Sequence, residues 1–213
     1  MGQGMFIVFE GVEGSGKTTQ ARLLGERLAR HGVDCLVTRE PGGTAAGEEI
    51  RRIVLHGGEI PARAELLLLL AARAVFVEEV VRPALERGAV VVADRYELST
   101  LAYQGYGRGL PLEEVRRLNA FATGGLAPDV TLVLDVASGV GEARRAREGR
   151  PADRIERAGA SFHARVAEAY RLLAETEPRV ERIDGAGRPE EVHAEVVRRL
   201  RARFPETMWL GEG

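Results

Sequence analysis

Residues 5–18 read Met5-Phe6-Ile7-Val8-Phe9-Glu10-Gly11-Val12-Glu13-Gly14-Ser15-Gly16-Lys17-Thr18. The apolar residues at the start predict a buried strand. Residues 11–18 then fit the phosphate-binding loop pattern of Gly, four residues, Gly, Lys and Ser or Thr, and a helical pattern follows. In such a loop the glycines let backbone N–H groups turn toward phosphate oxygens, and the N-terminus of the helix adds partial positive charge. The order of strand, loop and helix therefore predicts an α/β fold with a site for a nucleoside triphosphate.

Lysine occurs only once in the chain, at Lys17, although the chain has 30 basic residues. A lysine suits the β- and γ-phosphates because its ammonium group is a mobile point charge, whereas a planar guanidinium is bulkier. The hydroxyl of Thr18, the next residue, can bind Mg²⁺. The alternative is a glycine-rich turn that contains a lysine by accident, and it does not explain why strand, loop and helix follow one another as the motif requires.

Length and composition favour one ordinary domain. The chain has 213 residues, a formal net charge of −2 and a sequence pI of about 6.2. We therefore expect a single domain over residues 1–213, with a frayed tail at 206–213, and no nucleic-acid partner. The single cysteine, Cys35, excludes an internal disulfide and is compatible with a cytoplasmic location. The N-terminus lacks a secretory signal pattern and the apolar run Leu66–Ala72 is too short for a bilayer, so we expect no membrane association.

Short apolar runs alternate with helical patterns along the chain, which predicts a parallel sheet with crossover helices. The expected strands cover residues 5–9, 33–38, 89–93, 130–136 and 180–184. The expected helices cover residues 18–31, 45–55, 62–87, 111–123, 140–147, 155–175 and 189–203. The run at 89–93 is wholly apolar, which predicts a strand with both faces covered.

Charged residues follow several of the predicted strands. Glu10 and Glu13 come after the first strand, Arg39 and Glu40 after the second, and Asp94-Arg95 after the third. Ligands of parallel α/β sheets bind at the carboxyl ends of the strands, so we expect these side chains to converge on one crevice. An arginine on its own is more often a solvated charge, but two arginines beside a phosphate-binding loop favour a second anionic site.

Several linked segments of the chain resemble bacterial thymidylate kinases, and the resemblance covers nearly the whole chain. They are residues 9–20, Thr38-Arg39-Glu40-Pro41-Gly42-Gly43-Thr44, Asp94-Arg95-Tyr96, Ser99 through Ala102-Tyr103-Gln104-Gly105, Arg108-Gly109 and Asp153-Arg154-Ile155-Glu156. The loop alone indicates only a nucleoside triphosphate site. The Arg-Glu-Pro-Gly-Gly segment, together with Asp-Arg-Tyr and Tyr-Gln-Gly, is much more specific.

The resemblance implies a three-layer P-loop NTPase fold with a five-stranded parallel sheet and a short lid. It also implies transfer of the γ-phosphoryl group of ATP to thymidine monophosphate, giving thymidine diphosphate for dTTP synthesis. By similarity, ATP is held by Gly11, Val12, Glu13, Gly14, Ser15, Gly16, Lys17, Thr18 and Thr19. The resemblance also implies that Lys17 and Arg95 are catalytic, that Arg39 and Arg95 hold the acceptor phosphate, and that Glu13 accepts a hydrogen bond from the 3′-hydroxyl of the sugar. It further implies that Thr18 and Asp94 support Mg²⁺, directly or through water.

The resemblance also assigns the base site. Arg73 matches the arginine that reaches thymine O4, and because arginine carries only donors this contact would oppose the amino group of cytosine. Thr100 and Gln104 are further acceptor-binding residues by similarity, and Tyr103 matches a ring that packs beneath the sugar. The alternative for Tyr103 is a half-buried loop tyrosine without a role. Leu69 stands where the family commonly has a stacking phenylalanine, which puts the affinity for thymidine in doubt more than the reaction type.

Family members carry an arginine for the transferred phosphoryl group either in the phosphate loop or in a mobile lid. This chain has Gly14 and Ser15 at the loop position, and its lid segment, about 142–154, is rich in arginine. Gly149 and Pro151 interrupt the helical pattern there, as a flexible lid requires. We expect Arg147 or Arg150 to act in catalysis. The alternative for this basic cluster is a solvated helix end.

Three other classes of protein are alternatives to a thymidylate kinase. A guanine-nucleotide switch needs an Asn-Lys-x-Asp type motif, which is excluded because Lys17 is the only lysine and Asn119 the only asparagine. A partitioning ATPase gives no reason for Arg39, Arg73 and Arg95 to converge. A kinase for shikimate or another nucleoside monophosphate is the closest competitor, but it lacks the Tyr-Gln-Gly segment. By analogy with thymidylate kinases we expect a homodimer, with the apolar helix at 62–81 at the interface.

Overall fold

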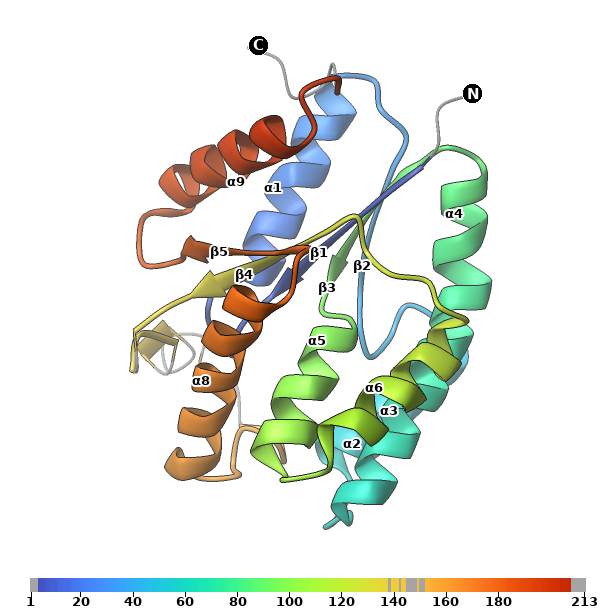
Figure 1. Ribbon diagram of the computed structural model, residues 1–213, viewed down its shortest axis with the longest axis vertical. Helices are drawn as coiled ribbons and strands as arrows, with labels where there is room; N and C mark the ends of the chain where they lie inside the picture. Colours follow the sequence, from blue (N-terminus) through green and yellow to red (C-terminus); the bar gives the residue numbers. More distant parts are fainter. Residues whose placement is uncertain (1–3, 138, 142, 145–148, 150–151, 208–213) are drawn as a thin grey trace.

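The computed structural model describes residues 4–137, 139–141, 143–144, 149 and 152–207. Its centre is a parallel sheet with the strand order β2-β3-β1-β4-β5 (Figure 1). The strands are β1 (Met5–Glu10), β2 (Cys35–Arg39), β3 (Val90–Asp94), β4 (Val130–Asp135) and β5 (Val180–Asp184). The predicted five-stranded parallel sheet is therefore confirmed, with strand ends within two residues of those expected.

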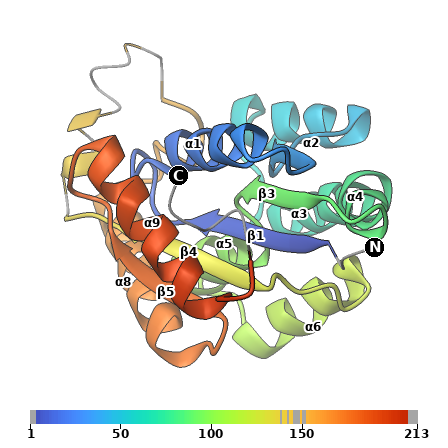
Figure 2. The ribbon, with the colours of Figure 1, turned by 90° about the horizontal axis from the view of Figure 1, so that it is seen from above.

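Helices cover both faces of the sheet, and Figure 2 shows the resulting three layers from above. They are α1 (Lys17–Arg30), α2 (Ala45–His56), α3 (Ala62–Phe76), η1 (Val77–Val81), α4 (Arg82–Glu86), α5 (Glu97–Thr100), η2 (Leu101–Gly107), α6 (Leu112–Thr123), α8 (Ala160–Thr176) and α9 (Pro189–Arg203). Among the described residues no helix is both long and apolar enough to cross a membrane.

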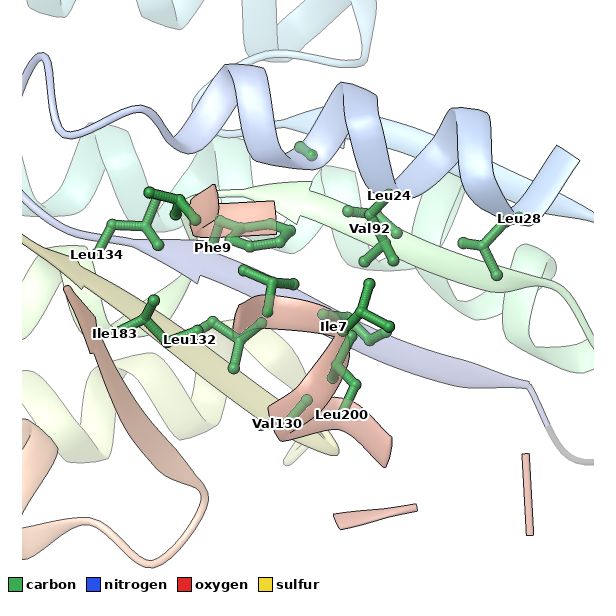
Figure 3. Close-up of a cluster of buried hydrophobic side chains, with 14 of the residues drawn as sticks. Ile7, Phe9, Leu24, Leu28, Val92, Val130, Leu132, Leu134, Ile183 and Leu200 are labelled. Atoms are coloured by element: carbon green, nitrogen blue, oxygen red, sulfur yellow. The ribbon is translucent and has the colours of Figure 1, made fainter. Parts of the chain in front are cut away.

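The alternation of side chains along β1 divides the core between the two faces of the sheet. Ile7 and Phe9 belong to the cluster that also contains Leu24 and Leu28 of α1 and Leu200 of α9 (Figure 3). Phe6 and Val8 point to the other face, where they pack with residues of α3, η1 and α4. A third cluster lies among α3, η2, α6 and α8. The strand is apolar on both faces because both are covered.

The register of the strands brings their charged ends level with one another. Phe9 of β1 pairs with Asp94 of β3, and Arg39 of β2 pairs with the same residue. The segments that follow these three strands therefore begin at one edge of the sheet, as the sequence predicted.

Two helical predictions were wrong. The helix expected at 155–175 begins only at Ala160, because Gly159 has φ +89°, a left-handed conformation that interrupts a helix. Residues 97–107, for which no helix was expected, form α5 and the π-helix η2. The expected helix at 62–87 does form, but as α3, the π-helical η1 and α4 in succession.

Candidate active site

A cleft of about 1310 Å³ opens at the carboxyl ends of β1, β2 and β3. Most of the predicted site residues line it: Glu13, Gly14, Ser15, Gly16, Lys17, Thr18, Thr19, Arg39, Leu69, Arg73, Asp94, Arg95, Thr100, Tyr103 and Gln104. Gly11 and Val12 lie in the loop that forms one wall, and Arg147 and Arg150 lie outside the described residues. One cleft of this size can hold two nucleotides side by side.

The phosphate-binding loop has the backbone that its glycines permit. Gly11, Gly14 and Gly16 have φ of +134°, +72° and +102°. At Gly11 and Gly14 the space is also closed to a side chain, because an added Cβ would lie 2.5 Å from the Leu134 carbonyl oxygen and 2.3 Å from that of Gly141. The loop is therefore specified by glycine for both conformation and packing.

Lys17 is the first residue of α1 and is only 5% exposed. Its Nζ donates to the carbonyl oxygen of Val12 at 2.8 Å, which turns the side chain back over the loop. Burial lowers the pKa of Lys17, and Arg95 lowers it further, while Glu13, Asp94 and Glu10 oppose this. The carboxylates around the loop therefore help to keep this buried ammonium charged.

Thr18 and Asp94 place a hydroxyl and a carboxylate close together in the cleft that Lys17 also lines. The Thr18 hydroxyl donates to Oδ2 of Asp94 at 2.5 Å, and both residues line the cleft. Among the described residues there is no cluster of three or more His, Cys, Asp or Glu side chains that could enclose a metal ion. One hydroxyl and one carboxylate suit Mg²⁺, which usually keeps several waters and shares its coordination with substrate phosphates.

Arg95 lies between the phosphate loop and the opposite wall of the cleft. Its Nη1 donates to the carbonyl oxygen of Gly11 at 3.1 Å and to the Tyr170 hydroxyl at 3.0 Å, and its Nη2 donates to a carboxylate oxygen of Glu13. Burial opposes its charge, but Glu13 and further partners more than compensate and raise the pKa of Arg95 well above its ordinary value. It is thus a fixed, permanently charged cation.

Glu10, the last residue of β1, is fully buried and organises the segment after β3. It accepts hydrogen bonds from the backbone N–H of Tyr96 at 2.8 Å and of Ser99 at 3.0 Å, and from the Tyr170 hydroxyl at 2.8 Å. The sequence placed Glu10 near the site, but its partners are distant in the chain. The structure shows it supporting the segment that carries Arg95.

Arg73 is buried, 3% exposed, and its guanidinium is held on several sides. Nε donates to Glu40 Oε2 at 2.8 Å, and Nη2 donates to the Tyr96 carbonyl oxygen at 2.9 Å. Nη1 donates to Thr100 Oγ1 at 2.7 Å and to Asn119 Oδ1 at 2.5 Å. An arginine has five N–H donors. Within the described part of the chain, one N–H of Nη2 therefore has no acceptor, and Arg73 lines the cleft.

Glu40 is the buried counterion of Arg73. Desolvation raises the pKa of Glu40 to about 7, although the ion pair and hydrogen bond with Arg73 act in the opposite direction. Its Oε1 and the Nδ2 of Asn119 have no hydrogen-bond partner among the described residues. Because Glu40 and Arg73 are both buried and form an ion pair, loss of either side chain leaves the other buried without its counterion.

Arg39 and Arg51 lie at the outer part of the cleft. The Arg39 guanidinium is exposed and Nη2 lies 3.2 Å from Oε1 of Glu48. Arg51 also lines the cleft, and its Nη1 donates to the Pro41 carbonyl oxygen at 2.9 Å. Sequence reasoning missed Arg51. Its spacing of three from Glu48 in a predicted helix was the available signal, because such residues share one face.

Tyr103 is not a half-buried loop residue. It lies in η2 and is 6% exposed. Its hydroxyl accepts from Arg95 Nη2 at 3.2 Å, and the Arg95 guanidinium carbon lies 5.1 Å from the centre of its ring. Leu69, on α3, is partly buried and lines the cleft.

Arg144 lies at the start of the arginine-rich segment 142–154 and is among the residues that the structure describes. It lies against the phosphate loop, with Nη1 3.3 Å from the Gly14 carbonyl oxygen, and its Nη2 donates to the Gly185 carbonyl oxygen at 3.0 Å. This segment therefore starts beside the loop. The residues expected to carry the catalytic arginine, 147 and 150, are outside the described part.

The fold and the site together define a P-loop kinase: a parallel α/β protein whose phosphate loop shares one cleft with a second group of cations. The sequence profile for thymidylate kinase matches residues 9–196. The chain is 54% identical to a thymidylate kinase of Synechococcus sp. (strain JA-3-3Ab) over 193 residues, 90% of this chain and 93% of the relative. It is 50% identical to that of Deinococcus radiodurans over 198 residues, 92% of this chain and 96% of the relative.

A solved structure agrees with this. The crystal structure of thymidylate kinase from Ehrlichia chaffeensis matches with a TM-score of 0.77 and 32% identity, covering 93% of this chain and 99% of that one. The chain therefore belongs to the thymidylate kinase family, the ATP-dependent nucleoside monophosphate kinases that convert thymidine monophosphate to thymidine diphosphate. The expected family, fold and reaction are confirmed.

Proposed function

We propose that this chain carries out the reaction of its family inside the cleft, by moving the γ-phosphoryl group of ATP directly onto thymidine monophosphate. The position of Arg95 is the observation that supports this most. It contacts Gly11 and Glu13 on the loop side and Tyr103 on the other side, where an acceptor would lie. The second pKa of a phosphate monoester is about 6, so at neutral pH the acceptor is mostly a dianion that needs no general base.

On the donor side, residues 11–19 hold the phosphates of ATP through their backbone N–H groups, and Lys17 meets the β- and γ-phosphates. Lys17 is already held over the loop by its contact with Val12, so little rearrangement is needed to direct it at a phosphate. Thr18 and Asp94 would hold Mg²⁺. The bound ion would offset part of the charge on the β- and γ-phosphates.

On the acceptor side, Arg95 and Arg39 hold the phosphate of thymidine monophosphate, and Arg51 adds a third cation to the same wall. Glu13 accepts a hydrogen bond from the 3′-hydroxyl of the deoxyribose, and Tyr103 packs beneath the sugar ring. These cations offset the repulsion between two anionic phosphates, which is the main electrostatic cost of the transfer.

The base lies between Leu69 and the Arg73 network. The remaining N–H of Arg73 donates to thymine O4, and Thr100 and Gln104 form the adjoining polar wall. Cytosine presents an amino group at that position, so a donor held rigidly by Glu40 opposes it. Leu69 supplies apolar contact without stacking.

We further propose that residues 142–154 form a lid that supplies Arg147 or Arg150 to the transferring phosphoryl group. The phosphate loop contains no arginine for this role, and Arg144 brings the start of the segment against the loop. An arginine supplied in this way can raise the rate by orders of magnitude. Replacing Arg147 and Arg150 together by alanine should lower the turnover number far more than it raises KM for thymidine monophosphate.

We propose a cytoplasmic homodimer with α3 and α6 at the interface. Leu67 on α3 is 58% exposed and Phe121 on α6 is 87% exposed, and these two helices pack beside one another (Figure 1). Apolar side chains exposed this far on neighbouring helices are typical of an association surface. Light scattering coupled to gel filtration measures the mass directly.

The experiment that tests the function is a coupled assay of ADP formation with the monophosphates of thymidine, deoxyuridine, deoxycytidine and deoxyguanosine. We expect the highest kcat/KM with thymidine monophosphate, a lower value with deoxyuridine monophosphate and very little activity with the other two. A preference for a different acceptor would contradict the assignment of the base site.

A further inference from the structure

Glu65, in the first turn of α3, is a fully buried carboxylate with several partners from distant parts of the chain. Its Oε1 accepts from Gln104 Nε2 at 2.7 Å and from Arg108 Nε at 3.2 Å. Its Oε2 accepts from Arg108 Nη2 at 3.1 Å and from Arg154 Nη2 at 2.6 Å. Both oxygens are therefore shared between η2, the residue just after it and the segment that precedes α8.

Glu65 does not line the cleft itself, but one of its partners does and another lies between two residues that do. Gln104 lines the cleft, and so do Asp153 and Ile155 on either side of Arg154. Arg154 is also fixed to the end of α2, since its backbone N–H donates to the Leu55 carbonyl oxygen at 2.9 Å. One carboxylate behind the wall thus connects α3, η2, the 153–155 turn and the end of α2.

We call Glu65 and its partners Gln104, Arg108 and Arg154 the Glu65 junction, and charge holds this junction together. Burial disfavours the ionised form of Glu65, but hydrogen bonds from Arg108, Gln104 and Arg154 outweigh it and keep the pKa of Glu65 below its ordinary value. The side chains of Arg108 and Arg154 are 23% and 13% exposed, so water replaces the carboxylate poorly if it is lost. A neutral side chain at position 65 would leave two guanidinium groups without their counterion.

We propose that Glu65 is a positioning residue for the acceptor. It holds Gln104 in the orientation that the base and sugar require, and it does so without touching the substrate. This rests on the proposed placement of the acceptor against Gln104. The ATP side of the cleft, formed by the phosphate loop and α1, has no contact with this junction in the described hydrogen bonds.

The test is steady-state kinetics of Glu65→Gln, which keeps the shape and removes the charge. We expect KM for thymidine monophosphate to rise about tenfold, the size of effect that follows from one weakened hydrogen bond to a charged group. KM for ATP should stay within about twofold because the loop is not part of the junction. Glu177→Gln is the matched control: its Oε1 lies 2.6 Å from Nη2 of Arg116 in another partly buried ion pair, and neither residue lines the cleft.

A double-mutant cycle with Gln104→Leu separates positioning from a general loss of structure. If Glu65 acts largely through Gln104, adding Glu65→Gln to Gln104→Leu should raise KM for thymidine monophosphate much less than Glu65→Gln does in the wild-type background. Independent, multiplying effects would overturn the proposal, and so would an unchanged acceptor KM or a parallel rise of both KM values.

If Glu65→Gln does not fold, Glu65→Asp keeps the charge but withdraws it by one methylene, and the same selective rise in acceptor KM is expected. The acceptor panel on the wild type tests the proposed function separately, so a normal panel with an unresponsive Glu65 variant would overturn only this inference.

Discussion

At the scale of single residues, the site depends on cations that are positioned by carboxylates and backbone carbonyl groups. Lys17 contacts the Val12 carbonyl oxygen, Arg95 contacts Glu13, and Arg73 contacts Glu40. Each cation is thereby held in one place by contacts within the protein, without a bound phosphate. Preorganised charge of this kind stabilises a transition state at little reorganisation cost.

We predict that Lys17→Arg abolishes phosphoryl transfer and leaves the fold intact. Lys17 is 5% exposed, and Gly11 and Gly14 of the adjoining loop have no room for a side chain, so a planar guanidinium does not fit where the ammonium does. Turnover and circular dichroism measure the two parts of the prediction. Arg30→Lys, on the exposed face of the same helix, is the control and should behave as the wild type. If the Lys17→Arg protein folded and kept near-normal turnover, this result would contradict the assignment of the loop to the active site.

The Arg73 network changes how base recognition should be tested. Arg73→Ala alone leaves Glu40 buried and unpaired, and breaking a buried pair in this way costs about 3–5 kcal/mol of stability. We therefore predict that Arg73→Ala is strongly destabilised, whereas Arg73→Ala with Glu40→Gln recovers part of that loss. Both variants should lose much of the preference for thymidine over deoxycytidine monophosphate. Thermal unfolding and the two kcat/KM values measure this, and a preserved preference would place base reading elsewhere.

At the scale of elements, apolar runs predicted every strand, but one helical segment was missed. Residues 97–107 contain glycine at 105 and 107, and because glycine has a low helix propensity the sequence does not predict a helix there. In the structure, Glu10 accepts the backbone N–H of Tyr96 and Ser99 at the start of that segment, from a position 86 and 89 residues away. Support from so far along the chain cannot be read from local sequence. The late start of α8 at Ala160, by contrast, had a local signal in Gly159.

The glycines of η2 follow from packing. A Cβ at Gly107 would lie 2.6 Å from Cε2 of Phe162 and 3.1 Å from a methyl group of Val166, both buried in α8. This close approach lets η2, whose Tyr103 and Gln104 line the cleft, pack directly against α8.

We predict that Gly107→Ala destabilises the protein. Overpacking a core costs about 1–3 kcal/mol, while the gain in helix propensity from Gly to Ala is only about 1 kcal/mol. The net loss should therefore be on the order of 1 kcal/mol in urea unfolding. Gly58→Ala is the matched control, since nothing lies within 4 Å of a Cβ there. Equal stability of the two variants would contradict the packing argument.

At the scale of the whole molecule, the sequence predicted which residues meet but not how they are connected. Every predicted site residue in the described chain lies in the phosphate loop or lines the cleft, because strand ends and motif spacing determine where such residues lie. The supporting partners were not predicted: Glu40 for Arg73, Glu65 for Gln104, and Asn119 beside Thr100. These contacts join segments that are far apart in sequence, and each depends on the tertiary packing of several helices.

We propose that one cleft holds donor and acceptor together so that the phosphoryl group passes directly between them. The most direct measurement uses a compound in which adenosine and thymidine are joined through their 5′ positions by a polyphosphate. We predict that it binds with a stoichiometry of one per chain in calorimetry and competes with both ATP and thymidine monophosphate in steady-state kinetics. A compound that competes with only one substrate, or that binds no more tightly than either nucleotide alone, would contradict a single shared cleft.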